Sequence, residues 1–235
     1  MPNHVTTRCT VYGPLDTVTK FRETCFSNEV DDDGDEYDVF DFNTVIPMPE
    51  SLRDSEEGSN ATFAKKLVEV RADFFAKHDA VLSEFDVKCI REHTGMMVEP
   101  IRDVVKVYLM QCPEIEALGL KRMKAIAETG YGSWYNWSLD NWGTKWNSYD
   151  VEISDDYQFV FTFCTAWSFP EPIFERLAEM FPDLSFYCVT FDEGFNFAGF
   201  GYYNPPEDEV AFHLCDATND MYEEVYGYPP DFETE

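Results

Sequence analysis

The sequence is short of positive charge. Its 235 residues include 17 Lys and Arg against 46 Asp and Glu, which gives a formal net charge of −29. Residues 177–235 contain fourteen acidic residues and no Lys or Arg. A surface this acidic repels nucleic acid and anionic membranes at long range, so we expect neither as a direct partner.

The motifs of common catalytic and nucleotide-binding sites are also missing. The sequence contains no GxSxG, no Walker A motif and no GxGxxG. The glycine-rich segment 194–201 has aromatic residues and no Lys, which favours a twisted or bulged strand over a phosphate-binding loop. We therefore expect a protein that is not an enzyme and that binds no cofactor.

Disulfide, metal and membrane signals are equally weak. The seven cysteines are odd in number and form no CxxC, which indicates free thiols in a reducing compartment. None of the four histidines lies four residues from another, so we expect no metal site. No apolar run approaches 18 residues and no signal peptide is evident, so we expect a cytoplasmic protein.

What is abundant is aromatic side chains and acidic residues in blocks. Aromatic residues make up 17% of the chain, enough to build a core. Residues 29–60 carry a net charge of −11 and residues 177–235 carry −14, whereas residues 61–128 are neutral. This pattern suggests that the acidic flanks form one structural unit and the neutral middle another.

Hydrophobic periodicity predicts an α+β fold. Strands are expected at 4–11, 39–46, 157–165 and 184–191, helices after Pro14 and at 170–181, and a hairpin at 196–203 and 210–214. Residues 61–128 have helical spacing throughout. We predict a ferredoxin-like split βαβ sheet formed by 1–55 and 129–235, with 56–128 as an inserted helical subdomain.

The aspartate run at 31–35 has the spacing of a calcium loop only in part. With Gly34 at the sixth position of the loop, the twelfth is Phe40, where a bidentate Glu is required. A solvated acidic loop is the favoured interpretation.

The most distinctive local feature is a Trp-rich loop. Four of the five Trp lie between 134 and 146, and Lys145 stands between two of them, where an ammonium can lie over an indole. A binding site is one interpretation, and its residues would be Asn141, Trp142, Gly143, Lys145, Trp146 and Asn147. The other is that these rings anchor the inserted helices to the sheet.

The string Asn141-Trp142-Gly143-Thr144-Lys145-Trp146-Asn147 resembles a signature of the Api-like and YubB-like proteins of plasmids and phages. Segments 40–43, 45–50, 196–199 and 201–203 also resemble motifs of that family, so the likeness extends over roughly residues 1–205. The resemblance implies a ferredoxin-like C-terminal domain and a mobile-element protein. It implies no reaction and no catalytic residues.

These features lead to the hypothesis of a non-enzymatic acidic binding protein. Its partner would be a basic host protein, such as a nuclease or a DNA-binding defence factor, approached by carboxylates in place of phosphates. The expected partner surface comprises Asp31, Asp32, Asp33, Asp35, Glu36, Glu207, Asp208 and Glu209. Two alternatives stay open: a small-molecule or nucleotide site at the Trp-rich loop, and a structural protein whose charge serves only solubility.

Overall fold

The computed structural model describes residues 3–30, 33–72, 82–154 and 158–230. The chain divides into two compact units. Met1–Pro47 and Ser138–Glu235 form one, here the sheet unit, and Met48–Trp137 form the other, here the helical unit. The expected insertion, 56–128, falls inside the helical unit. We expected the acidic block 29–60 to lie in one unit. That expectation is wrong, because its last residues, 48–60, lie in the helical unit.

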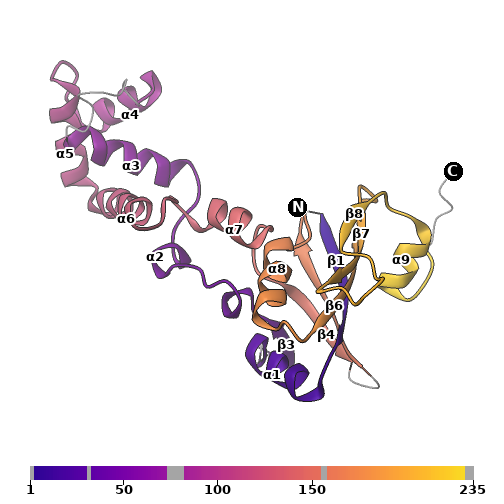
Figure 1. The fold of residues 1–235 in the computed structure, drawn as a ribbon. Helices are drawn as coiled ribbons and strands as arrows, with labels where there is room; N and C mark the ends of the chain where they lie inside the picture. The colour runs from indigo at the N-terminus through magenta and orange to yellow at the C-terminus, as the bar shows by residue number, and fades with distance from the viewer. Residues whose placement is uncertain (1–2, 31–32, 73–81, 155–157, 231–235) are drawn as a thin grey trace. The chain divides into compact units, whose positions relative to one another are not determined.

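The sheet unit contains an eight-stranded sheet with the order β2-β3-β4-β5-β1-β6-β7-β8 (Figure 1). Each strand is antiparallel to its neighbours. The strands are β1 (His4–Tyr12), β2 (Phe26–Val30), β3 (Glu36–Phe40), β4 (Tyr149–Ser154), β5 (Phe159–Ala166), β6 (Ser185–Asp192), β7 (Ala198–Tyr203) and β8 (His213–Cys215).

The centre of this sheet is the predicted ferredoxin-like arrangement. Strands β4-β5-β1-β6 lie side by side, α1 (Leu15–Cys25) follows β1, and α8 (Glu171–Met180) links β5 to β6. Both helices cover the same face, since Phe21 of α1 and Phe174 of α8 each contact the ring of Phe186 on β6. The protein therefore has an α+β fold with a ferredoxin-like sheet.

The predicted strand at 39–46 is wrong. The chain leaves the sheet after Phe40 and forms a 3-10 turn, η1 (Phe42–Thr44), where the Asp41 carboxylate accepts from the Asn43 N–H at 2.9 Å. This local hydrogen bond competes with strand pairing. The second strand of the ferredoxin-like motif is instead β4, which comes after the helical unit in the chain, and β2 and β3 extend the sheet beyond it.

Alternating burial places a phenylalanine core between the sheet and the two helices. In β1, Val5, Thr7, Cys9 and Val11 are fully buried, while the alternate residues, from His4 to Thr10, are half-exposed. Phe21 is fully buried and its ring lies 5.3 to 6.1 Å from four other Phe rings besides Phe26. Edge-to-face packing of this kind adds to the stability gained from burial.

The opposite face of the sheet is covered in part by α9 (Asn219–Tyr226), which the sequence did not predict. Thr218 caps the helix by accepting from the Met221 N–H, and Gly227 ends it in a left-handed conformation. Val225 packs with Val189, Phe191 and Ala198 in a second, smaller core. The acidic C-terminal part therefore includes an amphipathic helix as well as loops.

The helical unit is built around an aliphatic core. Its helices are α2 (Glu50–Arg53), α3 (Ser59–Ala72), α4 (Glu84–Thr94), α5 (Ile101–Gln111) and α6 (Pro113–Thr129), and α7 (Trp134–Trp142) begins within it. Leu67, Ile90, Val104 and Leu109 are fully buried together. A Cβ atom on Gly119 of α6 would lie 2.4 Å from the Ala64 carbonyl oxygen, so α3 and α6 pack too closely for a side chain there.

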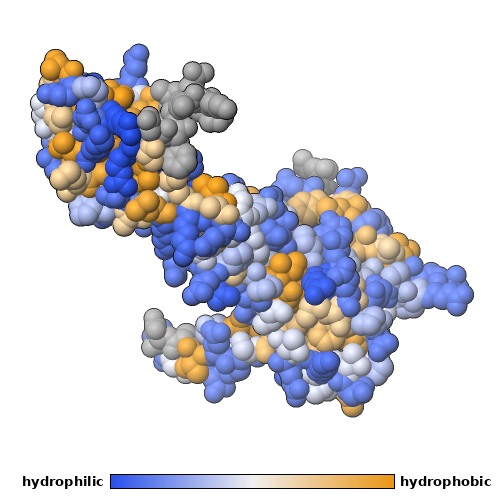
Figure 2. All heavy atoms as spheres, turned by 60° about the vertical axis from the view of Figure 1, so that its left-hand side comes forward, coloured by the Kyte–Doolittle hydropathy of each residue, from blue (hydrophilic) through white to orange (hydrophobic). Residues whose placement is uncertain are grey.

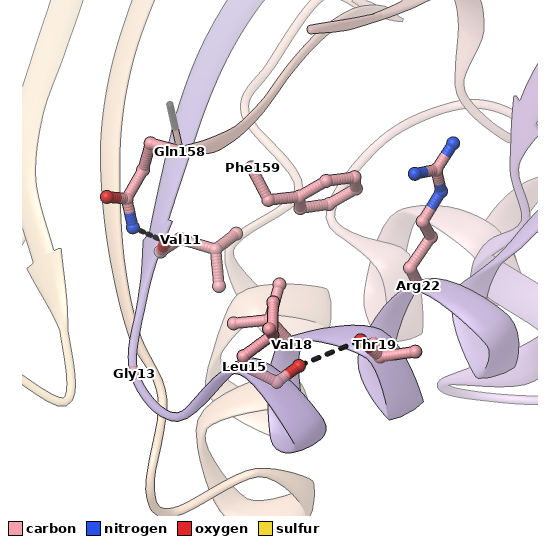
Figure 3. Close-up of a pocket in the computed structure, with 8 residues that line it drawn as sticks. All are labelled: Val11, Gly13, Leu15, Val18, Thr19, Arg22, Gln158 and Phe159. Atoms are coloured by element: carbon pink, nitrogen blue, oxygen red, sulfur yellow. Dashed lines mark hydrogen bonds between the residues drawn. The ribbon is translucent and has the colours of Figure 1, made fainter. Parts of the chain in front are cut away.

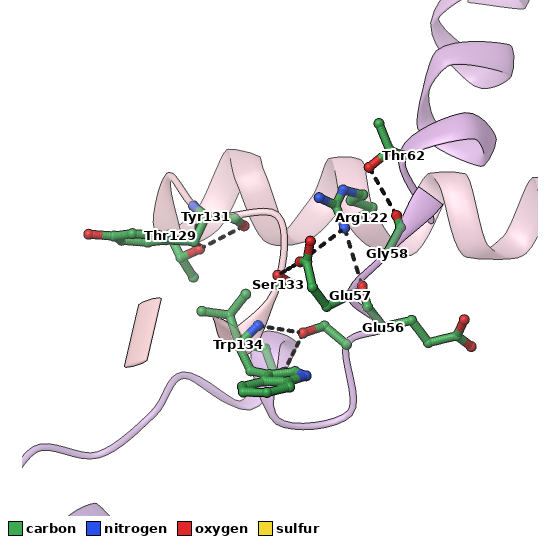
Figure 4. Close-up of polar contacts among 11 residues, drawn as sticks. Glu56, Glu57, Gly58, Thr62, Arg122, Thr129, Tyr131, Ser133 and Trp134 are labelled. Carbon is green, nitrogen blue, oxygen red and sulfur yellow. Dashed lines mark hydrogen bonds and ion pairs between the residues drawn. The ribbon is translucent and has the colours of Figure 1, made fainter. Parts of the chain in front are cut away.

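Polar contacts hold the first and last parts of the helical unit together (Figure 4). Arg122 of α6 donates to the Glu56 carbonyl at 3.2 Å and pairs with the Glu57 carboxylate at 3.7 Å. The Ser133 hydroxyl also donates to Glu57, and the Trp134 N–H donates to the Ser55 hydroxyl at 2.8 Å. Residues 66 to 79 positions apart in the sequence are thus joined by hydrogen bonds within one unit.

Among the described residues, no helix combines the length and the apolar character that crossing a bilayer requires. Hydrophilic residues cover much of the visible surface, with apolar residues in small groups between them (Figure 2).

Candidate binding surfaces

The expected Trp-rich loop begins as a helix and ends as a turn. Helix α7 covers Trp134–Trp142, and the residues after it lead into β4. Two of the six predicted site residues support the fold from inside. Trp142 is only 4% exposed, and its indole donates to the Ile46 carbonyl at 2.9 Å. The Asn147 side chain accepts from the Phe42 N–H at 2.9 Å and donates to Asp41 at 2.7 Å.

Gly143 is required by the backbone at this turn. Its φ is 77°, and a Cβ atom there would lie 2.8 Å from Pro172 Cδ. Asn141 is half-buried at the end of α7. The segment 141–147 therefore serves mainly to hold residues 40–46 and the start of α8 in place within the sheet unit, through packing and hydrogen bonds.

Unlike Trp142, Trp146 is exposed, and it lies beside Lys145. Trp167, from the turn after β5, lies on the same ammonium. The Lys145 Nζ lies 4.5 Å from the Trp146 ring centroid and 4.7 Å from that of Trp167. Trp146 is 36% exposed and Trp167 is 40% exposed. Both distances are within the range of a cation–π interaction. We call these three residues the indole clamp.

Buried hydroxyl groups fix the two turns that carry the indole clamp. Thr144 is fully buried and donates to the Ala166 carbonyl at 2.8 Å, and Ser138 is fully buried and donates to the Lys145 carbonyl at 2.6 Å. The Ser168 hydroxyl donates to the Gly143 carbonyl. The backbone on either side of the clamp is thus held by side-chain hydrogen bonds, two of them from fully buried hydroxyl groups.

Sequence reasoning missed Trp167 because it lies 21 positions after Trp146 and follows an ordinary strand. Its backbone adopts φ 74°, a left-handed conformation that is rare for a bulky residue. No sequence signal marks that conformation. The one available hint was that an isolated Trp follows a strand predicted to end near Thr165.

The predicted acidic surface is divided between the two edges of the sheet. Asp33, Asp35 and Glu36 are exposed at the β2–β3 turn, and Glu207, Asp208 and Glu209 are exposed between β7 and β8. Because β2 and β8 are the outermost strands, these clusters lie roughly 30 Å apart across the sheet. We expected the two clusters to form one surface, and they do not. Asp31 and Asp32 lie outside the described residues.

The two structural units differ strongly in net charge. The sheet unit contains five basic and 31 acidic residues, a net charge of −26, whereas the helical unit contains twelve basic and fifteen acidic residues, a net charge of −3. At most a few of the carboxylates in the sheet unit can pair with a base of the same unit. The acidity of the chain is therefore a property of the ferredoxin-like part.

A groove of about 500 Å³ lies beside α1 (Figure 3). Val11, Val18 and Phe159 supply apolar surface, and Arg22 of α1 extends over the Phe159 ring at 5.6 Å. Gln158 donates to the Val11 carbonyl at the other side. Leu15 lines the groove but is 82% exposed, so it does not close it, and the groove is open and shallow.

A second cavity, of about 410 Å³, lies in the helical unit between α3, α4 and α5. Cys89 and His93 line it from α4 and Tyr108 lines it from α5, while the His93 Nε2 contacts the Cys112 thiol at 3.6 Å. Burial, followed by the nearby Cys112 thiol, raises the pKa of Tyr108. Within the described parts of the chain, no three His, Cys, Asp or Glu residues are placed to hold a metal ion.

The cysteines are free thiols, and several are buried. Cys9 and Cys188 lie on neighbouring central strands with their sulfur atoms 3.6 Å apart, and both are fully buried. Burial raises the pKa of the Cys188 thiol, and burial raises the pKa of Cys25 to about 12. These groups stay protonated near neutral pH and are poor nucleophiles. Cys89 is the exposed exception.

Comparison with known proteins finds one family model. Residues 141–225 match the model described as a ferredoxin-like domain in Api92-like protein. None of the curated proteins matches the sequence. Among solved structures, the crystal structure of a protein api92 from Yersinia pseudotuberculosis is similar with a TM-score of 0.42 and 10% sequence identity, over 93% of this chain and 99% of that one. A score this low supports no conclusion about function.

Proposed function

We propose that this chain is a non-enzymatic binding protein whose sheet unit engages a basic protein surface. One observation supports the proposal above the others: the net charge of −26 in the sheet unit against −3 in the helical unit. If acidity served only solubility, it would be expected over both units alike. Its restriction to the ferredoxin-like part favours a use that is specific to that part.

Carboxylates at both edges of the sheet would act first on the rate of association. Long-range attraction steers a basic partner toward the sheet unit, and salt screens this attraction within about 10 Å at 0.1 M. Because the two acidic clusters lie at opposite edges, a partner of ordinary size makes direct contact with one cluster while the other contributes to the field. A positively charged groove that normally holds nucleic acid is the kind of surface that such carboxylates fit.

The biological setting of the proposal comes from the resemblance of segments 40–50, 141–147 and 196–203 to proteins of plasmids and phages. A mobile element benefits from a protein that occupies a basic nuclease or another DNA-binding defence factor. The match of residues 141–225 to an Api92-like domain is compatible with this setting and assigns no activity.

The experiment compares capture of proteins from host extract by four forms of the chain. Two forms neutralise an acidic cluster each, D33N/D35N/E36Q and E207Q/D208N/E209Q. A third, E92Q/E114Q/E128Q, removes the same charge from exposed positions in the helical unit. The wild type is the fourth, and capture is read by mass spectrometry at low and high salt.

Support requires that a captured basic protein is released by salt, binds directly when purified, and is retained less by at least one sheet-unit variant than by the helical-unit variant. Equal capture by all four forms, or capture indifferent to salt, would refute the proposal.

The alternative of a nucleotide site at the Trp-rich segment has less support, since Trp142 and Asn147 are committed to contacts inside the sheet unit. A thermal shift of the wild type by a nucleotide, absent in a Trp146→Ala variant, would reverse this preference.

A further inference from the structure

We propose that the indole clamp is the point at which an arginine side chain of the basic partner is held, and that Lys145 occupies this position until the partner displaces it. The inference rests on the proposed function for the class of partner. It adds the recognition residues, Trp146 and Trp167, and the chemical group they take, a guanidinium.

Trp146 and Trp167 already hold a cation between their rings. Two exposed indoles converge on a single ammonium at 4.5 and 4.7 Å, so the pair binds a cation in this structure. That cation belongs to a flexible side chain whose ammonium is readily hydrated when it swings away. Lys145 therefore shows which chemistry the two rings accept and is itself easily exchanged.

The backbone of Trp167 is held in an unusual conformation. Its φ of 74° is a left-handed conformation that is unfavourable in a residue other than glycine. The Trp167 N–H is held by the Asn3 carbonyl at 3.0 Å, and Thr165 donates to the Ser168 carbonyl at 2.8 Å, so the surrounding turn enforces the conformation. Since Trp167 stays 40% exposed, burial of its ring offsets this cost only in part.

A guanidinium suits the two indole rings better than the ammonium of Lys145. A guanidinium is planar, less strongly hydrated than an ammonium, and stacks on aromatic faces. Arginine is also common in proteins that bind nucleic acid. In a unit with a net charge of −26, an approaching arginine is attracted from a distance and then meets two rigidly mounted indoles.

The experiment uses two peptides of equal length and charge, nona-arginine and nona-lysine, and measures their dissociation constants for the intact chain by isothermal titration. The wild type is expected to prefer nona-arginine. Trp146→Ala and Trp167→Ala are each expected to lower that preference by about fivefold, the worth of a cation–π contact. Phe85→Ala, which removes another exposed ring from the helical unit, is expected to leave it unchanged.

Displacement of Lys145 is tested by a matched pair of charge changes. Lys145→Met and Lys20→Met remove one positive charge each from the sheet unit. If the peptide takes the place of the ammonium, Lys145→Met binds nona-arginine about threefold or more tightly than Lys20→Met does. Equal affinities of these two variants, or an arginine preference untouched by both Trp substitutions, would overturn the clamp.

Failure of the clamp can be told from failure of the proposed function. If D33N/D35N/E36Q and E207Q/D208N/E209Q weaken both peptides while the Trp variants change nothing, the acidic unit binds basic chains without the clamp. If the acidic variants bind both peptides as the wild type does, the electrostatic proposal itself fails. Circular dichroism of each variant confirms that it is folded before titration.

Discussion

The sheet unit and the helical unit balance their charged residues in different ways. In the helical unit, bases and acids are close to equal in number, and ion pairs join separate elements, such as Arg71 of α3 with Glu116 of α6. In the sheet unit, five bases face 31 acids, so most carboxylates repel one another. The comparison shows that the acidity of the chain is concentrated in one of its two units.

The two cores differ in a related way. The helical unit buries mostly aliphatic side chains, including Leu67, Ile90 and Leu109. Between the sheet and helices α1 and α8, the sheet unit buries a set of Phe side chains whose rings contact one another: Phe21, Phe40, Phe42, Phe161, Phe163, Phe174 and Phe186. Large aromatic rings supply much burial per residue. A core of this kind offsets the charge repulsion on the same unit's surface.

The largest expected effect is on the free energy of unfolding, and it distinguishes the buried Trp142 from the exposed Trp146. Trp142→Ala removes a buried indole and its hydrogen bond to Ile46, and should lower the free energy of unfolding of the sheet unit by about 3–5 kcal/mol. Trp146→Ala should change it by no more than about 0.5 kcal/mol. Urea unfolding followed by hydrogen exchange of the sheet-unit amides distinguishes the two. Similar losses in both variants would show that this division is wrong.

A substitution at Gly119 should affect the helical unit alone. In Gly119→Ala the new methyl group meets the Ala64 carbonyl, so α3 and α6 must separate at a cost of about 1–3 kcal/mol. Amide exchange should accelerate in α3 and α6 and stay unchanged in β1, β5 and β6. Equal acceleration in the sheet strands would mean that the two units unfold together.

Alkaline pH should weaken the sheet unit first. The folded-state pKa of Cys25 is raised by burial from 9.0 to about 12, so the folded form keeps a proton that the unfolded form loses. The associated stability is complete below pH 9 and is lost as pH rises toward 12. Between pH 8 and 10 the thermal midpoint of the sheet unit should fall by about 5 °C. Cys25→Ala should show a smaller fall, and an unchanged slope would contradict this cause.

The smallest expected effect is that of salt on stability. Raising the salt concentration from about 20 mM to 0.5 M screens repulsion in the sheet unit and should raise its thermal midpoint by about 2–4 °C. The helical unit should shift little or fall, since its ion pairs are screened too. Differential scanning calorimetry with hydrogen exchange to assign each unit provides the test. A larger rise of the thermal midpoint in the helical unit would contradict the assignment of charge repulsion to the sheet unit.

The sequence predicted the elements whose periodicity is strong. Helix α8 and strands β5 and β6 lie within one or two residues of their expected limits, because hydrophobic spacing and nearby Pro residues mark them. Strand β4 was missed since its alternation is short, with only Val151 and Ile153 as aliphatic residues on the half-buried side. Helix α9 was missed because acidic residues mask its apolar face, Met221, Tyr222 and Val225.

The candidate site was predictable only in part. Lys145 and Trp146 stood out as a base between indoles in an acidic chain. The inward position of Trp142 could not be inferred, because its partner is a backbone carbonyl 96 residues earlier. The separation of the acidic clusters also depends on strand order, which places β2 and β8 at opposite edges and which periodicity does not reveal.

The most direct test of the account measures where charge controls binding. Stopped-flow association rates of the nona-lysine peptide are compared at low and physiological salt for the wild type, a variant combining D33N/D35N/E36Q with E207Q/D208N/E209Q, and a helical-unit variant with six exposed carboxylates neutralised. The account predicts that the sheet-unit variant associates about threefold or more slowly than the helical-unit variant at low salt, and that the difference shrinks at physiological salt. Equal slowing by the two variants would contradict the claim that the ferredoxin-like unit attracts the basic partner.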